Sequence, residues 1–132
     1  MSETFCPDEA ATRALGASLA EKLKRGDLVL LEGPLGAGKT TFVRGILEGL
    51  GYEGPVRSPT FNLLQTFETE PPVVHVDLYR VPSTEGIGLD DYMATHLCLL
   101  EWPDRAPELA ESKATRVTIA FEAEGRRVRI AD

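Results

Sequence analysis

The chain has 132 residues, and 21 Asp and Glu against 14 Lys and Arg give a formal net charge of −7 at pH 7. The length predicts a single domain over residues 1–132. An acidic balance argues against a protein that grips nucleic acid by itself, because phosphate backbones are bound through a basic surplus. The longest apolar run, residues 28–31, is far shorter than the roughly 20 residues of a membrane span. Two widely separated cysteines and the lack of a signal-peptide pattern predict a cytoplasmic protein with no membrane partner.

The acidic excess lies in the middle of the chain. Residues 68–111 carry 10 acidic and 2 basic side chains, a net of −8. Residues 1–67 have a net of −1, and residues 112–132 a net of +2. Most of these carboxylates are expected to be solvated, and a few to hold a metal ion.

Hydrophobic periodicity predicts helices and strands that alternate along the chain. The expected elements are a helix from Pro7 to Gly26, a buried strand over 27–32, a helix over 41–50, strands over 61–67, 73–77 and 97–101, and a hairpin with strands over 116–121 and 127–130. Three buried strands interleaved with helices predict an α/β fold. We expect three layers, α/β/α, with a mainly parallel central sheet and a C-terminal antiparallel hairpin.

Residues 33–40 read Gly-Pro-Leu-Gly-Ala-Gly-Lys-Thr and match the phosphate-binding pattern G-x-x-x-x-G-K-[ST]. The glycines allow the backbone to wrap closely around phosphate, and the N-terminus of the following helix attracts the same anion. Lys39 is expected to reach the terminal phosphates, and the Thr40 hydroxyl to complete a Mg²⁺ shell. The alternative is a Gly-rich turn with an incidental lysine. The expected phosphate-binding residues are Gly33, Leu35, Gly36, Ala37, Gly38, Lys39, Thr40 and Thr41.

A phosphate-binding loop of this kind needs an acidic partner for Mg²⁺ at the end of a neighbouring strand. Asp77 ends the strand over 73–77, and its alternative role is to cap a turn. Glu101 ends the strand over 97–101, where it either contacts Mg²⁺ and an attacking water or is a surface carboxylate. Thr60 either belongs to a simple turn or offers its hydroxyl to Mg²⁺ or phosphate. His75 and Cys98 lie among apolar strand residues and are interpreted as core side chains.

Five motifs follow one another in an order that resembles the bacterial tRNA threonylcarbamoyladenosine biosynthesis ATPase family TsaE, also called YjeE. The resemblance extends from about Pro7 to Val128. The motifs are Gly-Ala-Gly-Lys-Thr-Thr-Phe at 36–42, Arg-Ser-Pro-Thr-Phe at 57–61, Val-Asp-Leu-Tyr-Arg at 76–80, Gly-Leu-Asp-Asp-Tyr at 88–92 and Cys-Leu-Leu-Glu-Trp-Pro at 98–103.

The resemblance implies a P-loop NTPase fold and a weak, Mg²⁺-dependent ATPase that binds ATP and ADP. It implies two partner proteins, TsaB and TsaD, in a complex that adds threonylcarbamoyl to the adenosine beside the tRNA anticodon. This chain would then meet tRNA only through that complex. Carried over by position, Lys39 and Thr40 hold phosphate and Mg²⁺, Asp77 is the Walker B acid, and Glu101 is the second active-site carboxylate. Thr60 becomes the switch threonine.

Three further residues take roles only through the resemblance. Trp102 is expected beside the nucleotide, and Thr12 near the adenine. Arg126 either borders the same part of the site or is a solvated charge. The chain departs from the family at residues 81–87, where the segment is shortened, and at Pro34, where an acidic residue is frequent. A small P-loop kinase of a metabolite and a module that only binds nucleotide remain the alternative functions.

Overall fold

The computed structural model describes residues 2–56, 64–79, 88–110 and 112–132. Within these residues one sheet has the strand order β1-β7-β6-β2-β5-β4-β3. The strands are β1 (Ser2–Cys6), β2 (Leu28–Glu32), β3 (Leu64–Phe67), β4 (Val73–Asp77), β5 (Leu97–Glu101), β6 (Thr115–Glu122) and β7 (Gly125–Ala131). The helices are α1 (Glu9–Ala20), α2 (Lys39–Gly49), α3 (Asp90–Met93) and α4 (Pro107–Ala110), with a short 3₁₀ turn at Pro103–Arg105.

The centre of the sheet is parallel and its two borders are antiparallel. β2 pairs in parallel with β5 and β6, and β5 pairs in parallel with β4. The β6–β7 hairpin continues into β1 on one side, and β3 joins β4 on the other. The expected mainly parallel centre and C-terminal hairpin are therefore confirmed.

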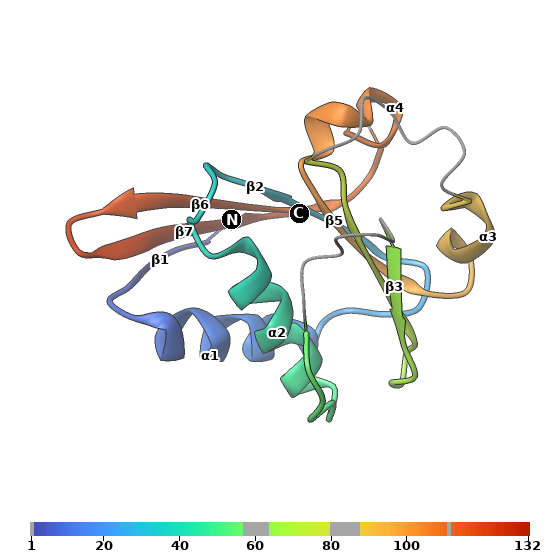
Figure 1. The fold of residues 1–132 in the computed structure, drawn as a ribbon, viewed down its shortest axis with the longest axis horizontal. Helices are drawn as coiled ribbons and strands as arrows, with labels where there is room; N and C mark the ends of the chain where they lie inside the picture. Colours follow the sequence, from blue (N-terminus) through green and yellow to red (C-terminus); the bar gives the residue numbers. More distant parts are fainter. Residues whose placement is uncertain (1, 57–63, 80–87, 111) are drawn as a thin grey trace.

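Helices cover both faces of the sheet (Figure 1). Because side chains alternate along a strand, Val29 and Leu31 of β2 pack beneath α1 and α2. Leu28 and Leu30 pack on the opposite face, in the cluster that includes α3 and α4 residues. Nearly continuous burial of the central strands explains why they are apolar at every position rather than at alternate ones. The predicted three-layer arrangement is confirmed.

α1 and α2 approach each other at glycines. A Cβ at Gly16 would lie 2.5 Å from the Phe42 carbonyl oxygen, and a Cβ at Gly45 would overlap the Arg13 carbonyl. Because glycine has no Cβ, the two helix backbones lie so close together that any larger residue at these positions would overlap the other helix. This contact packs α2 directly against α1. The N-terminus of α2 lies beside the carboxyl end of β5, where Thr40 is hydrogen-bonded to Glu101.

Several predicted boundaries are wrong, and one strand was missed. α1 begins at Glu9, because the Asp8 side chain caps it by accepting a 2.9 Å hydrogen bond from the Ala11 N–H, and Pro7 stays outside. The helix ends at Ala20, and Gly26, with φ at +87°, lies in the turn that enters β2. β1 was not predicted, since its residues are mostly exposed and lack an apolar pattern.

The remaining boundaries differ less. β3 begins at Leu64, and residues 61–63 of the expected strand lie outside the described residues. The hairpin strands are longer than expected at both ends. No helix in the described ranges is long and apolar enough to cross a membrane.

Candidate functional site

The P-loop, residues 33–40, connects the end of β2 to the start of α2. Gly36 and Gly38 have φ values of +81° and +109°, which residues with a Cβ rarely adopt. At Gly33 a Cβ would overlap the Ile119 carbonyl oxygen of neighbouring β6. The spacing of the glycines therefore follows from the local backbone, which leaves the α2 N-terminus open to an anion.

Lys39 is buried in the loop that it belongs to. Its Nζ donates to the carbonyl oxygens of Gly33 and Pro34 at 2.6 and 3.0 Å, and lies 4.1 Å from the centroid of the Trp102 ring. Loss of hydration lowers the pKa of Lys39, and the nearby Glu101 and Asp77 carboxylates offset part of that effect. The ammonium group is thus held at the loop by contacts that an incoming phosphate can replace.

Asp77 and Glu101 end adjacent parallel strands and are paired in register. The Thr40 hydroxyl donates to Glu101 Oε2 at 3.1 Å, and Asp77 Oδ1 accepts from the Tyr79 N–H at 3.0 Å. Burial raises the pKa of Asp77, the Tyr79 hydrogen bond lowers it, and Glu101 raises it further. Glu101 is only 3% exposed, so it is not a surface carboxylate.

This donor set fits Mg²⁺, which prefers oxygen ligands and keeps several waters or phosphate oxygens in its shell. A hydroxyl and two carboxylates lie together beside the P-loop. Among the described residues no three His, Cys, Asp or Glu form a cluster that could hold a metal on its own. A bound phosphate would therefore have to complete the coordination.

His75 is the residue that the sequence interpretation missed. It is fully buried, as expected of a core histidine, but its Nε2 lies 2.6 Å from Glu101 Oε2. It stands two residues before Asp77 on the same strand, and hence on the same face of the sheet. That two-residue spacing was the available signal, because it placed the ring on the side of the predicted metal-binding acid.

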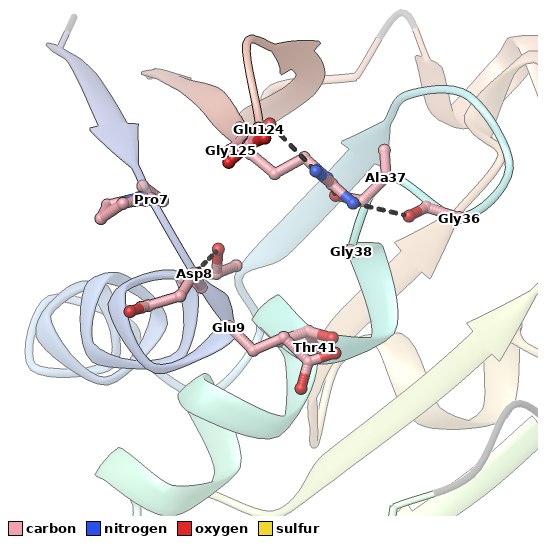
Figure 2. A pocket seen from close by; sticks show the side chains of 12 residues that line it. Pro7, Asp8, Glu9, Gly36, Ala37, Gly38, Thr41, Glu124 and Gly125 are labelled. Atoms are coloured by element: carbon pink, nitrogen blue, oxygen red, sulfur yellow. Dashed lines mark hydrogen bonds between the residues drawn. The ribbon is translucent and has the colours of Figure 1, made fainter.

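A pocket of about 200 Å³ lies beside the loop (Figure 2). Figure 2 shows the P-loop on one side, Asp8 and Glu9 at the start of α1 on another, and Glu124 and Gly125 of the hairpin on a third. The lining residues are Cys6, Pro7, Asp8, Glu9, Thr12, Gly36, Ala37, Gly38, Thr41, Glu124, Gly125 and Arg126. Thr12 and Arg126, for which the family resemblance implied a place near the nucleotide, both border this pocket.

Arg126 is attached to the P-loop rather than solvated. Its Nε donates to the Ala37 carbonyl oxygen at 2.9 Å, and one terminal nitrogen donates to the Gly36 carbonyl oxygen at 3.4 Å. The guanidinium also stacks 4.3 Å from the centroid of the exposed Phe121 ring. The hairpin is thereby tied to the apex of the loop.

The remaining residues named in the sequence analysis are Trp102, Leu35 and Thr60, which were expected at the site, and Cys98, which was expected in the core. Trp102 has a left-handed backbone, with φ at 63°, and its ring lies 4.8 Å from that of Tyr79. Leu35 points into solvent and is 66% exposed. Cys98 is a buried core thiol, as expected, and burial raises its pKa to about 12. Thr60 and the segment 81–87 lie outside the described residues.

Comparisons with known proteins give one consistent result. Residues 6–129 match the model of a family described as threonylcarbamoyl adenosine biosynthesis protein TsaE. The tRNA threonylcarbamoyladenosine biosynthesis protein TsaE of Streptomyces coelicolor is 43% identical over 109 residues, which cover 76% of this chain and 74% of the relative. Its namesake in Haemophilus influenzae is 33% identical over 136 residues, covering 96% and 86%. The crystal structure of Bacillus subtilis YdiB matches with a TM-score of 0.83 at 30% identity, covering 98% of this chain and 83% of that one.

Proposed function

The chain belongs to the TsaE family of tRNA threonylcarbamoyladenosine biosynthesis proteins, and from this premise we propose that it is a Mg²⁺-dependent ATPase that supports the modification of tRNA. The observation that carries the proposal is the meeting of Lys39, Thr40 and the two strand-end carboxylates beside the P-loop. Open α/β sheets bind ligands beyond the carboxyl ends of their strands, which is where these groups lie.

Each group has a role that its position supports. The backbone N–H groups at the start of α2 bind the phosphates of ATP, and Lys39 moves its ammonium from the loop carbonyls onto the terminal phosphates. Thr40 and Asp77 are the residues that would hold Mg²⁺, which neutralises charge on the phosphate oxygens when it is bound. Glu101 orients the attacking water through its buried carboxylate. Thr60 is proposed as the switch threonine from its motif alone.

The pocket beside the loop is proposed to take the base and sugar of the nucleotide. It lies on the α1 side of the P-loop and is bordered by Thr12 and Arg126. Asp77 and Glu101, at the ends of β4 and β5, are not among its lining residues. Its volume of about 200 Å³ is of the right order for a nucleoside. Trp102, beside Lys39, would then lie near the phosphates rather than the base.

The proposed partners are TsaB and TsaD, whose complex would carry out the threonylcarbamoyl transfer in the cytoplasm. We expect slow hydrolysis by the chain alone. Among the described residues, the arginine that contacts the P-loop is Arg126, and its guanidinium is engaged with backbone carbonyls. Contacts to tRNA would belong to the partners, in keeping with the net charge of −7.

The test measures phosphate release from ATP and Mg²⁺, with and without both partner proteins. Wild type should be slow alone and faster in the complex. Lys39→Ala, Asp77→Ala and Glu101→Ala should each lower the rate by about 100-fold or more, the usual loss for a group that stabilises the transition state. Arg129→Ala is the control, because Arg129 is exposed on β7 and does not line the pocket.

Two outcomes would overturn the proposal. One is fast hydrolysis that ignores the partners, and the other is an unchanged rate in Lys39→Ala. Transfer of the γ-phosphate to a small acceptor would favour the metabolite kinase instead, and tight nucleotide binding with no turnover in the complex would favour the binding module.

A further inference from the structure

His75 shares a face of the sheet with both site carboxylates. On β4, Val74 and Val76 pack into the cluster that includes α3 and α4 residues, whereas Val73 packs beneath α1 and α2. Because strand side chains alternate, His75 and Asp77 fall on the Val73 side. On β5, the same alternation puts Glu101 on that face.

The His75 ring reaches diagonally across to β5. The register pairs His75 with Leu99 and Asp77 with Glu101, so Glu101 is the diagonal neighbour of His75. Long side chains can span such a diagonal. His75 Nε2 lies 2.6 Å from Glu101 Oε2, the same oxygen that accepts from the Thr40 hydroxyl. One carboxylate oxygen is therefore held by two groups from two different elements.

The position of the His75 proton follows from the other ring nitrogen. In the described part of the protein, Nδ1 is buried and has no hydrogen-bond partner. A proton on Nδ1 alone would leave a buried N–H without an acceptor and a bare Nε2 facing a carboxylate. We therefore assign the proton to Nε2, from which it donates to Glu101. A histidine that orients a functional carboxylate in this way acts as an outer-shell support.

We propose that His75 is a positioning residue for Glu101, which it holds by donating its Nε2 proton to Oε2 so that the carboxylate keeps one orientation at the P-loop. The proposal rests on the proposed ATPase function, in which Glu101 orients the attacking water. Two donors on Oε2 restrict rotation of the carboxylate and so set the direction in which its other oxygen meets that water. Of the two hydrogen bonds to Oε2, loss of the His75 donor would leave the one from Thr40, so the carboxylate would be held less firmly.

A pair of amide variants separates this role from a structural one. In His75→Gln the amide nitrogen sits about where Nε2 was, so the donor to Glu101 is kept. In His75→Asn the amide reaches only as far as Nδ1, so the donor is lost, although the buried group is equally polar and neutral. The assay is ATP hydrolysis by the full chain with TsaB and TsaD, together with calorimetric binding of Mg-ADP.

His75→Asn should lower kcat by about 10- to 100-fold, as loss of an outer-shell partner usually does. Mg-ADP affinity should stay within about threefold, because the P-loop contacts that bind phosphate are untouched. His75→Gln should recover most of the lost rate. Val76→Ala is the control: it opens a cavity on the other face of the same strand, so it should lower stability but leave kcat unchanged.

A double-mutant comparison shows whether His75 acts through Glu101. In a Glu101→Gln background, adding His75→Asn should lower the rate little further, because the group that His75 positions is already gone. Losses that multiply, or equal rates for the Gln and Asn variants, overturn the positioning role. If Glu101→Gln itself leaves hydrolysis unchanged, the proposed function fails, which is a different result from failure of His75 alone.

A spectroscopic measurement needs no variant of His75 to fold. The chain has only two histidines, His75 and His96, so ¹⁵N-histidine labelling with a His96→Gln variant assigns both rings. We expect a protonated Nε2 and a bare Nδ1 for His75, with the Nε2 resonance moving in Glu101→Gln. A bare Nε2, or resonances that ignore Glu101→Gln, would overturn the proposal.

Discussion

Asp77 and Glu101 are paired residue for residue at the ends of β4 and β5, so their side chains leave the sheet next to each other on the α2 face. Burial removes hydration from the charged form of Asp77, and the neighbouring Glu101 carboxylate adds a smaller repulsion. Both effects raise the pKa of Asp77. A cation bound beside Asp77 would offset this penalty on its charged form.

The electrostatic cost of a charged Asp77 gives a pH-dependent prediction for Asp77→Asn. Because the pKa of Asp77 is higher in the folded state than its usual 3.8, the folded protein binds more protons in the window between the two values. Stability then falls as pH rises through that window, and the penalty is fully present above it. Asp77→Asn should raise the Tm of the nucleotide-free protein at pH 7, and the difference should shrink as the pH falls towards 4.

A second arm of the experiment adds Mg-ADP. It should raise the Tm of the wild type more than that of Asp77→Asn, because Asp77 is one of the two residues that would hold the ion. Thermal unfolding over pH 4–8 measures both effects. A variant that is less stable than wild type at pH 7 would contradict the assigned direction of the Asp77 pKa.

Trp102 should report movement of Lys39. It is the only tryptophan in the chain, and its ring lies 4.1 Å from Lys39 Nζ. When Lys39 leaves the ring for a phosphate, the electrostatic environment of the indole changes. Titration with Mg-ADP should therefore change the fluorescence of the wild type. Lys39→Met, saturated with Mg-ADP as judged by calorimetry, should show a much smaller change, and an equal change in both proteins would contradict the coupling.

Arg126→Ala should weaken nucleotide binding. The change removes the charged donors from the Ala37 and Gly36 carbonyls, which steady the apex of the P-loop. Hydrogen bonds of this kind are worth about 1.5–3 kcal/mol, so the Kd for ADP should rise by about 10-fold or more. Arg126→Lys should not restore it, since lysine lacks the planar fork. Arg129→Ala, on the same strand, is the matched control, and a similar loss in both would argue against the bracing contact.

Gly45→Ala tests the contact between α1 and α2. Helix propensity by itself predicts a gain of about 1 kcal/mol from this change. A Cβ would instead overlap the Arg13 carbonyl, and overpacking usually lowers the free energy of unfolding by about 1–3 kcal/mol. The sign of the change in urea denaturation distinguishes the two effects. A stabilised variant would show that the helices can move apart freely.

Prediction from the sequence succeeded where consecutive residues carry the information. The strand over 73–77 and the strand over 97–101 have the predicted bounds, because each is a short, mostly apolar run that ends at a carboxylate. β1 escaped prediction because it is an edge strand with only Cys6 buried, and its pairing with β7 rather than its composition makes it a strand. α1 began later than expected because the Asp8 cap, and not Pro7, marks its start.

The P-loop, the apolar strands and the order of family motifs could be predicted from the amino-acid sequence, since each depends on spacing within a short stretch of chain. The contacts between side chains that are distant in the chain could not be predicted in this way. His75 contacts Glu101 across 26 residues, and Arg126 contacts Ala37 across 89. Those contacts depend on strand register and on how the hairpin packs against the loop, and neither can be predicted from the spacing of neighbouring residues. Two of the ten acidic residues in the segment 68–111, Asp77 and Glu101, are thus brought together by the fold beside the P-loop.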